Sequence, residues 1–242
     1  MQKDDRNVLT FAAIVCITCS VLLSGAAALL EKRQAYNIEL DRKINVLKAF
    51  GVDVVDEKGR KILTGDEVDG YFKEYISEVV LDGKTGDIIR GKTTTDLSMN
   101  DLKRKTMLPL YKWTEKGSVK KYAFPISGKG LWSTLYGYMA LEDDLSTIIG
   151  ITFYKHGETP GLGGECDQPW FQNAFKGKLV WENGKLLPFE VVKGEVANKY
   201  PSGNDHAVDG ISGATITSKG IQTFLRSDLA LYDNYFRTIR GS

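Results

Sequence analysis

The chain has 242 residues, 42% of them apolar, and its 32 basic and 31 acidic residues give a net charge of +1. This length and apolar content are sufficient for a membrane anchor and one or two folded units with a hydrophobic core. The balanced charge provides no basic stripe, which speaks against nucleic-acid binding.

The first predicted element is an apolar helix, because residues Val8 to Leu30 carry no charge. As a helix this run would extend about 35 Å, enough to cross a hydrocarbon core of about 30 Å. The alternative is a cleaved signal peptide, since Lys3 and Arg6 precede the run and Gly25-Ala-Ala-Ala28 resembles a cleavage site. We favour the anchor, because the run exceeds a signal core of about 7 to 15 residues and Glu31 to Phe50 continues it with helical periodicity.

The basic residues do not orient this anchor clearly. Two precede the apolar run and four follow it closely: Lys3, Arg6, Lys32, Arg33, Arg42 and Lys43. A simple count of basic residues would place the large domain in the cytoplasm.

The next segment mixes helix and strand signals. Thr64-Gly-Asp-Glu67 fits a capping box and predicts a helix behind it. Ser77 to Ile89 predicts two strands joined by a turn, and Lys112 to Gly117 predicts a turn before a strand at Val119 to Ile126.

From residue 132 onward the pattern predicts antiparallel hairpins. Leu135 to Leu141 and Thr147 to Tyr154 are rich in aromatic and β-branched residues and predict one hairpin. Lys178 to Trp181 and Leu186 to Val192 predict a second, joined through Asn183-Gly184. No crossover helices alternate with these strands, so we expect an α+β fold: a transmembrane helix, then a soluble domain of antiparallel hairpins and flanking helices.

The segment Asp209-Gly-Ile-Ser-Gly-Ala-Thr-Ile-Thr217 precedes an amphipathic run that predicts a helix starting near Thr217 or Ser218. A helix start offers free N–H groups to a phosphate, and the hydroxyl groups nearby can hydrogen-bond to it or carry it covalently. The simpler alternative is an ordinary N-cap, for which Ser and Thr are common.

The longer segment resembles the flavinylation motif of the FMN-binding domain that occurs in the C subunit of the sodium-translocating NADH:quinone oxidoreductase and in the G subunit of the RNF complex. His156-Gly-Glu-Thr-Pro-Gly-Leu-Gly163 resembles the second FMN-pocket motif of that family. Gly128-Lys-Gly-Leu-Trp-Ser133 and Tyr136-Gly-Tyr138 resemble a segment of the quinone reductase protein. The resemblance implies that Thr217 carries FMN through a phosphoester bond.

The resemblance also implies which residues surround the flavin. Ser212, Gly213, Ala214, Thr215 and Ile216 would shape the cradle for the phosphate. The remaining candidates would contact or orient the ring: Trp132, Glu158, Thr159, Gly161, Leu162 and Gly163. Trp132, Leu162 and Trp170 could equally be ordinary core residues.

The resemblance further implies a subunit that relays electrons and has no independent catalytic activity. Its partners would be the other subunits of the complex and a flavin transferase that uses FAD and magnesium. The family places the flavin domain in the periplasm, anchored in the bacterial inner membrane by a single helix. We expect four parts: residues 1–30 with the anchor, a juxtamembrane helix at 31–50, the first part of the soluble domain at 51–120, and the FMN-binding domain at 121–242. The RNF protein is the alternative within the same class.

Other classes of function have weaker signals. Gly161-Leu-Gly-Gly164 lacks the third glycine of a dinucleotide loop, and His156 with Glu158 lacks the cysteines of a zinc deaminase. We expect no metal site. Ser212 with His206 and a nearby aspartate could form a serine hydrolase triad, although the second glycine of a nucleophile elbow is absent. A membrane-tethered binding module without cofactor would leave Thr217 and its neighbours unexplained.

Overall fold

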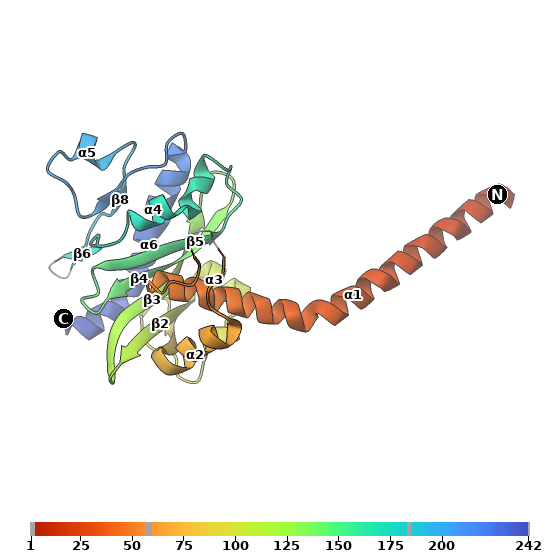
Figure 1. Ribbon diagram of the computed structural model, residues 1–242, viewed down its shortest axis with the longest axis horizontal. Coiled ribbons are helices and arrows are strands. Elements are labelled where there is room, and N and C mark those ends of the chain that lie inside the picture. Colours follow the sequence, from red (N-terminus) through yellow and green to blue (C-terminus); the bar gives the residue numbers. More distant parts are fainter. Residues whose placement is uncertain (1–2, 57–59, 183–184, 242) are drawn as a thin grey trace. The chain divides into compact units, whose positions relative to one another are not determined.

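The computed structural model describes residues 3–56, 60–182 and 185–241 (Figure 1). Contacts divide the chain into two compact units, one ending at Arg42 and the other beginning at Lys43. The first unit lies within helix α1 (Lys3–Ala49), whose continuation beyond residue 30 confirms the helical prediction for that stretch. The large apolar side chains of α1 between Val8 and Leu30 are exposed. By length and composition α1 could cross a membrane.

The second unit is built on one five-stranded antiparallel sheet whose strands follow each other in chain order. Its strands are β1 (Ile76–Asp82), β2 (Met107–Glu115), β3 (Ser118–Lys129), β4 (Thr134–Glu142) and β5 (Ile148–Lys155). Neighbouring strands pair without a crossover, which is the open meander that the predicted hairpins required.

Helices cover both faces of this sheet. On one face the long helix α6 (Thr215–Arg240) packs on β3, where the rings of Phe124 and Tyr232 lie 4.3 Å apart. On the other face, α2 (Gly65–Tyr75) contributes Phe72 against Tyr111. The main core lies between the sheet and α6, where alternate strand residues and one stripe of the helix are buried together.

Short elements fill the longer connections. Between β1 and β2 lie η1 (Thr94–Asp96) and α3 (Met99–Arg104). Between β5 and α6 lie η2 (Gly163–Asp167), α4 (Pro169–Asn173), β6 (Trp181–Glu182), β7 (Lys185–Leu186), β8 (Glu190–Val191), α5 (Val196–Lys199) and β9 (Ala207–Val208). Strands β6 and β7 pair antiparallel, and β8 and β9 pair in parallel. The chain therefore reaches the start of α6 through a region of short strands, 3₁₀ turns and loops.

Several local predictions are confirmed. Thr64 and Glu67 form the predicted capping box, with the Glu67 amide donating to Thr64 Oγ1 at 3.3 Å. Strands β3, β4 and β5 lie where the sequence placed them, and β4 pairs with β5 as an antiparallel hairpin. The α+β class is confirmed.

Three local predictions are corrected. The turn predicted at residues 112–117 begins later, because residues 112–115 belong to strand β2. Lys112 and Thr114 alternate there with the buried side chains of Tyr111 and Trp113, as in a strand. The second strand near residue 88 is reduced to a single bridge between Leu81 and Ile88, and the chain turns away at Gly91 (φ 76°). The predicted strand 186–192 is interrupted at Pro188, which cannot donate to a ladder. The Asn183-Gly184 turn lies outside the described residues.

The four-part division of the chain stays a prediction. Strands on both sides of residue 120 belong to one sheet, and α1 runs without a break through residue 30.

Candidate functional site

The site centres on the start of α6, where the predicted attachment residue lies. The helix begins at Thr215, two residues before the expected position, and its N-cap residue is Ala214, which has no side chain able to cap it. Gly213 has a φ of 71° and turns the chain into the helix. The ordinary N-cap alternative is therefore wrong for this motif, because no Ser or Thr side chain caps α6.

The backbone around this start is rich in unpaired donors. Within the described part of the chain, the N–H groups of residues 212, 213, 215, 216 and 217 have no acceptor. The dipole of the 26-residue helix α6 adds partial positive charge at the same point. The first N–H groups of a helix have no partner within it, and residues 212, 213, 215 and 216 are exposed, so the oxygens of a phosphate can reach these donors.

Thr217 itself is buried, with 1% of its surface exposed. Its hydroxyl donates to Oε2 of Glu158 at 2.7 Å. Glu158 is also buried and accepts from the backbone N–H groups of the loop that follows β3: Leu131 at 3.2 Å, Trp132 at 2.9 Å and Ser133 at 3.0 Å. Glu158 therefore joins the start of α6 to this loop.

These contacts also set the charge state of the Glu158 carboxyl group. Burial raises its pKa, but the hydrogen bonds from Thr217, Ser133, Trp132 and Leu131 outweigh it and lower the pKa below the ordinary value. Glu158 is therefore a carboxylate at neutral pH, held in place by its own chain.

Gly163 of the second motif lies against the Thr217 hydroxyl. A Cβ atom on Gly163 would lie 2.7 Å from Thr217 Oγ1 and 2.8 Å from Glu158 Oε2, so a larger residue there would have to displace these two side chains. Beside it, a Cβ atom on Gly213 would lie 2.8 Å from Cδ2 of Leu162. The loop 158–163 and the segment before α6 are thus in close contact.

An open cleft of about 790 Å³ borders this site. It is lined by Gly161, Glu165, Trp170, Lys193, Gly194, Glu195, Asp209, Gly210, Ile211, Ser212, Gly213 and Thr215. Four large apolar side chains among the candidate residues are exposed, Trp132 by 68%, Leu162 by 44%, Trp170 by 47% and Ile216 by 60%, and of these Trp170 lines the cleft. The ordinary-core alternative is wrong for Trp132, Leu162 and Trp170, whose exposed surfaces remain available to an apolar ring.

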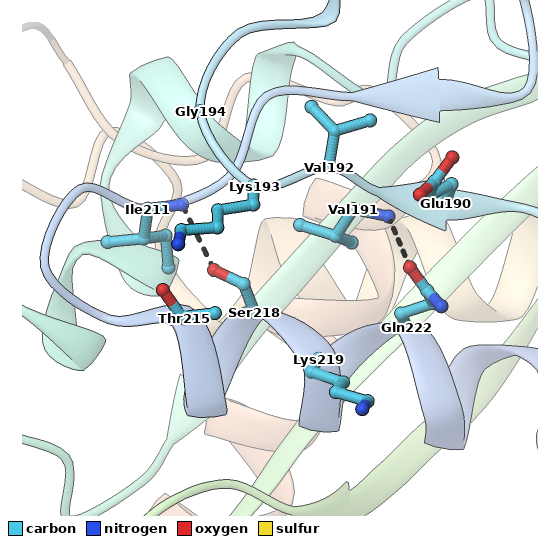
Figure 2. Close-up of a pocket in the computed structure, with 10 residues that line it drawn as sticks. All are labelled: Glu190, Val191, Val192, Lys193, Gly194, Ile211, Thr215, Ser218, Lys219 and Gln222. Atoms are coloured by element: carbon cyan, nitrogen blue, oxygen red, sulfur yellow. Dashed lines mark hydrogen bonds between the residues drawn. The ribbon is translucent and has the colours of Figure 1, made fainter. Parts of the chain in front are cut away.

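A smaller cleft of about 210 Å³ also lies beside the first turn of α6, and Figure 2 shows its lining. Lys193 and Thr215 line both clefts. In Figure 2 the Ile211 N–H donates to Ser218 Oγ, a bond of 3.0 Å that fixes the turn. Lys193 and Lys219 line this smaller cleft and bring two cations to the first turn of α6. The sequence did not predict these two residues, because no motif marks them.

The remaining predicted residues lie at the edge of this group. The carbonyl of Thr159 accepts from the N–H groups of Leu162 at 3.1 Å and Gly164 at 2.9 Å, which folds the loop. Gly161 has a φ of 73°. The structure brings Glu158, Gly163 and Thr217 into direct contact, whereas the side chains of Thr159 and Ile216 are exposed and have no polar or ring contact among the described residues.

The geometry gives no support to the hydrolase and zinc alternatives. His206 Nδ1 pairs with the carbonyl of Leu179 at 3.2 Å, and Asp209 accepts from the N–H of Val196 at 2.6 Å, so neither pairs with Ser212. His156 Nε2 lies 3.2 Å from Asp167. Among the described residues, no group of three or more His, Cys, Asp or Glu side chains could hold a metal ion.

An antiparallel sheet backed by a long helix, with an uncapped helix start beside an open cleft, is suited to a phosphate-bearing ligand, and a family match gives the class of this protein as an FMN-binding domain protein. The FMN-binding domain family matches residues 130–230, which begin at the loop after β3 and end within α6.

Full-length relatives narrow this class further. The chain is 33% identical to the C subunit of the Na⁺-translocating NADH-quinone reductase of Pseudomonas aeruginosa over 244 residues, covering 93% of this chain and 91% of that protein. The corresponding protein of Vibrio vulnificus strain YJ016 is also 33% identical, with 92% and 90% covered. The chain belongs to this family, the C subunits of the Na⁺-translocating NADH-quinone reductase.

Solved structures agree with this family. The crystal structure of the C subunit from Parabacteroides distasonis superposes with a TM-score of 0.71 at 31% identity, covering 85% of this chain and 96% of that one. The crystal structure of NqrC from Shewanella oneidensis gives a TM-score of 0.69 at 27% identity, covering 84% and 97%.

Proposed function

We propose that this protein is a membrane-anchored electron carrier with FMN bound covalently to Thr217 through a phosphoester bond. The observation that carries the proposal is the start of α6, where a buried threonine lies within a run of unpaired backbone donors beside an open cleft. Family membership supports FMN as the cofactor. Bound FMN supplies one-electron and two-electron redox chemistry, while the protein sets its position and exposure.

The residues present fit this group. The N–H groups of residues 212, 213, 215, 216 and 217 can donate to phosphate oxygens, and Lys193 can add a positive charge at the edge of the cleft. The cleft volume of about 790 Å³ falls within the range of about 300–1,000 Å³ that small-molecule sites occupy. The exposed side chains of Trp132, Leu162 and Trp170 offer apolar contact to a planar ring.

We propose that a second protein attaches the flavin at Thr217. As the family resemblance implies, this would be a flavin transferase that supplies FMN from FAD with magnesium. The Thr217 oxygen then forms a bond to the flavin-side phosphorus, the diphosphate bridge breaks, AMP leaves, and the hydroxyl proton passes to a base of the transferase. Thr217 is an acceptor in this step.

The anchor and the partners belong to the same proposal. We place α1 across the bacterial inner membrane as a single span, with the sheet and α6 in the periplasm and the other reductase subunits alongside. A C-terminal alkaline phosphatase fusion should be active and a green fluorescent protein fusion dark. The opposite result would follow from the count of basic residues beside the helix and would overturn the orientation. The family supports the quinone reductase over the RNF complex.

The test of the attachment is flavin fluorescence in a denaturing gel after co-expression with the transferase. The wild type and Thr217→Ser should fluoresce, because both retain a hydroxyl, and Thr217→Ala should be dark. Thr215→Ala is the matched control, since Thr215 is also in the first turn but is not the proposed acceptor. Retained fluorescence in Thr217→Ala would overturn the proposal.

A further inference from the structure

We propose that Glu158 is a positioning residue that closes the acceptor site, so that flavin is transferred only to a conformer in which the hydrogen bond between Glu158 and Thr217 is open. We call this hydrogen bond, from Thr217 Oγ1 to Glu158 Oε2, the latch. The inference rests on the proposed attachment at Thr217 and adds how that residue becomes reactive.

The closed structure leaves no path to the acceptor oxygen. Transfer requires a phosphorus atom within about 3–3.5 Å of Thr217 Oγ1 and aligned with the breaking bond. Thr217 is only 1% exposed, and its hydroxyl proton is already used in the latch. Above it, Gly163 lies so close that even a Cβ atom would be 2.7 Å from the hydroxyl oxygen. A phosphoryl group is far larger than a methyl group, so the closed state cannot react.

The two sides of the latch differ in how firmly they are held. On one side, the Glu158 carboxylate accepts three backbone N–H bonds from the loop that links β3 to β4. On the other side, residues 212, 213, 215 and 216 are exposed, and their N–H groups have no acceptor within the described residues. Segments with few contacts open at low cost. Ile211, Ala214 and Ser218 are buried, and the Ile211 N–H donates to Ser218 Oγ. The moving part is therefore the exposed turn between Ile211 and Ser218 together with Thr217, not the loop after β5 that carries Glu158.

Glu158 does not act as the base of the transfer. Five donors surround its carboxylate, and a carboxylate stabilised in this way binds a proton weakly. Once Thr217 has moved away to meet the transferase, Glu158 is also no longer in contact with the reacting oxygen. Its effect is on the closed state, which it stabilises through a charge-assisted hydrogen bond.

The latch also makes the modification one-way in structural terms. After transfer, the Thr217 oxygen has no proton and cannot donate to Glu158. The carboxylate would face a phosphodiester of the same charge sign, which disfavours a return to the closed arrangement. The modified segment must settle with the latch open.

The test compares flavinylation rates of the purified full-length chain in detergent, with limiting transferase, FAD and magnesium. In Glu158→Gln the charged acceptor of the latch is lost. If the NH₂ group of the new side chain takes the place of Oε2, it also faces the Leu131 N–H, which is another donor. The latch should therefore open more easily. We expect the rate to rise about tenfold, equivalent to about 1.4 kcal/mol. Hydrogen exchange at the N–H groups of Ala214 and Ser218, which are hydrogen-bonded in the closed segment, should rise by a similar factor.

Two control variants and one independent test variant separate the effect of the latch from other effects. Glu115→Gln changes a carboxylate at the end of β2 that accepts from Trp113 and lines neither cleft, and should leave the rate unchanged. Tyr232→Phe removes a buried hydrogen bond to Pro109 farther along the same helix, so it lowers global stability without opening the first turn. Leu162→Ala removes the contact beside Gly213 from a half-exposed position and should raise both rate and exchange even if Glu158→Gln folds poorly.

Each outcome has a distinct meaning. A rate that falls at least tenfold in Glu158→Gln would show that Glu158 serves as the base and would overturn the latch. Faster exchange with an unchanged rate would show that the closed state reacts, which also overturns it. Equal acceleration in Tyr232→Phe would attribute the effect to global unfolding. Absence of flavin from wild-type Thr217 would overturn the proposed function itself, a result that the wild-type lane alone reveals.

Discussion

A buried ion pair far from the cleft provides the sharpest prediction about stability. Asp228 on α6 is 2% exposed and accepts from the Ser127 N–H at 2.8 Å and from the Lys105 ammonium group, which also donates to the Ser127 carbonyl at 2.8 Å. These bonds join α3, β3 and α6. In the chain, Ser127 comes shortly before the loop after β3, whose N–H groups donate to the Glu158 carboxylate.

Lys105→Met leaves the Asp228 carboxylate buried without its cation. Breaking a buried pair in this way costs about 3–5 kcal/mol. We expect the lower end, about 3 kcal/mol, because the Lys105 side chain is 26% exposed. For a chain of this size, each kcal/mol shifts Tm by about 2–4 °C, so the expected loss is about 6–12 °C.

The loss should depend on pH in a defined direction. Burial raises the pKa of Asp228 above its ordinary value, despite the opposing effects of Lys105 and the Ser127 N–H, and removal of Lys105 raises it further. A carboxyl group with a raised pKa in the folded state contributes stability below its unfolded pKa, and this contribution is lost as pH rises through the folded value. The deficit of Lys105→Met should therefore be largest near pH 8 and shrink toward pH 4.5.

The assay is urea unfolding of the full chain in detergent at both pH values. Lys103→Met, at an exposed position on the same helix, should change stability by less than about 0.5 kcal/mol. The double variant Lys105→Met/Asp228→Asn should recover at least about 1 kcal/mol, because the uncompensated charge is gone. A deficit in Lys105→Met that is equal at pH 4.5 and pH 8 would refute this reasoning.

Three further predictions concern packing, capping and thiol chemistry. Gly128→Ala should destabilise the protein by about 1–3 kcal/mol in urea unfolding, because the new Cβ would lie 2.6 Å from Phe224 Cγ. Gly70→Ala is the matched control on α2. It has open space around the new Cβ and should instead stabilise the protein by about 0.5–1 kcal/mol. Thr64→Ala should cost about 1 kcal/mol by the same measurement, whereas Thr64→Ser should retain the cap, and equal losses in the two variants would contradict the capping role. Burial raises the pKa of Cys166 to about 12, so in a Cys16→Ser/Cys19→Ser background a maleimide at pH 8 should label it only as the protein unfolds; rapid labelling of the folded protein would contradict the burial.

Local patterns predicted those parts of the fold and site that short-range physics decides. The capping box at Thr64 and the hairpin β4–β5 depend on neighbouring residues, and both are present. The two glycine-containing motifs gave Thr217 and the loop at Gly163 as parts of one site, and the structure places them in contact.

Contacts between distant residues could not be predicted in this way. The latch joins residues 59 positions apart, and the pair Lys105–Asp228 joins residues 123 positions apart. Side-chain periodicity carries no information about such partners. Lys193 was missed for the same reason, since only the folded chain brings it to the start of α6. The strand expected at 186–192 failed because pairing with β9 and the break at Pro188 outweighed local strand propensity.

The mass of one tryptic peptide tests the central claim most directly. Trypsin releases Tyr200 to Lys219 from the chain, and this peptide contains Thr217 and the whole motif before it. After co-expression with the flavin transferase, its mass should increase by that of FMN less one water, and fragmentation should place the addition on Thr217. An unmodified peptide, a simple phosphate, or FMN located on Ser212 or Thr215 would contradict covalent flavin attachment at Thr217.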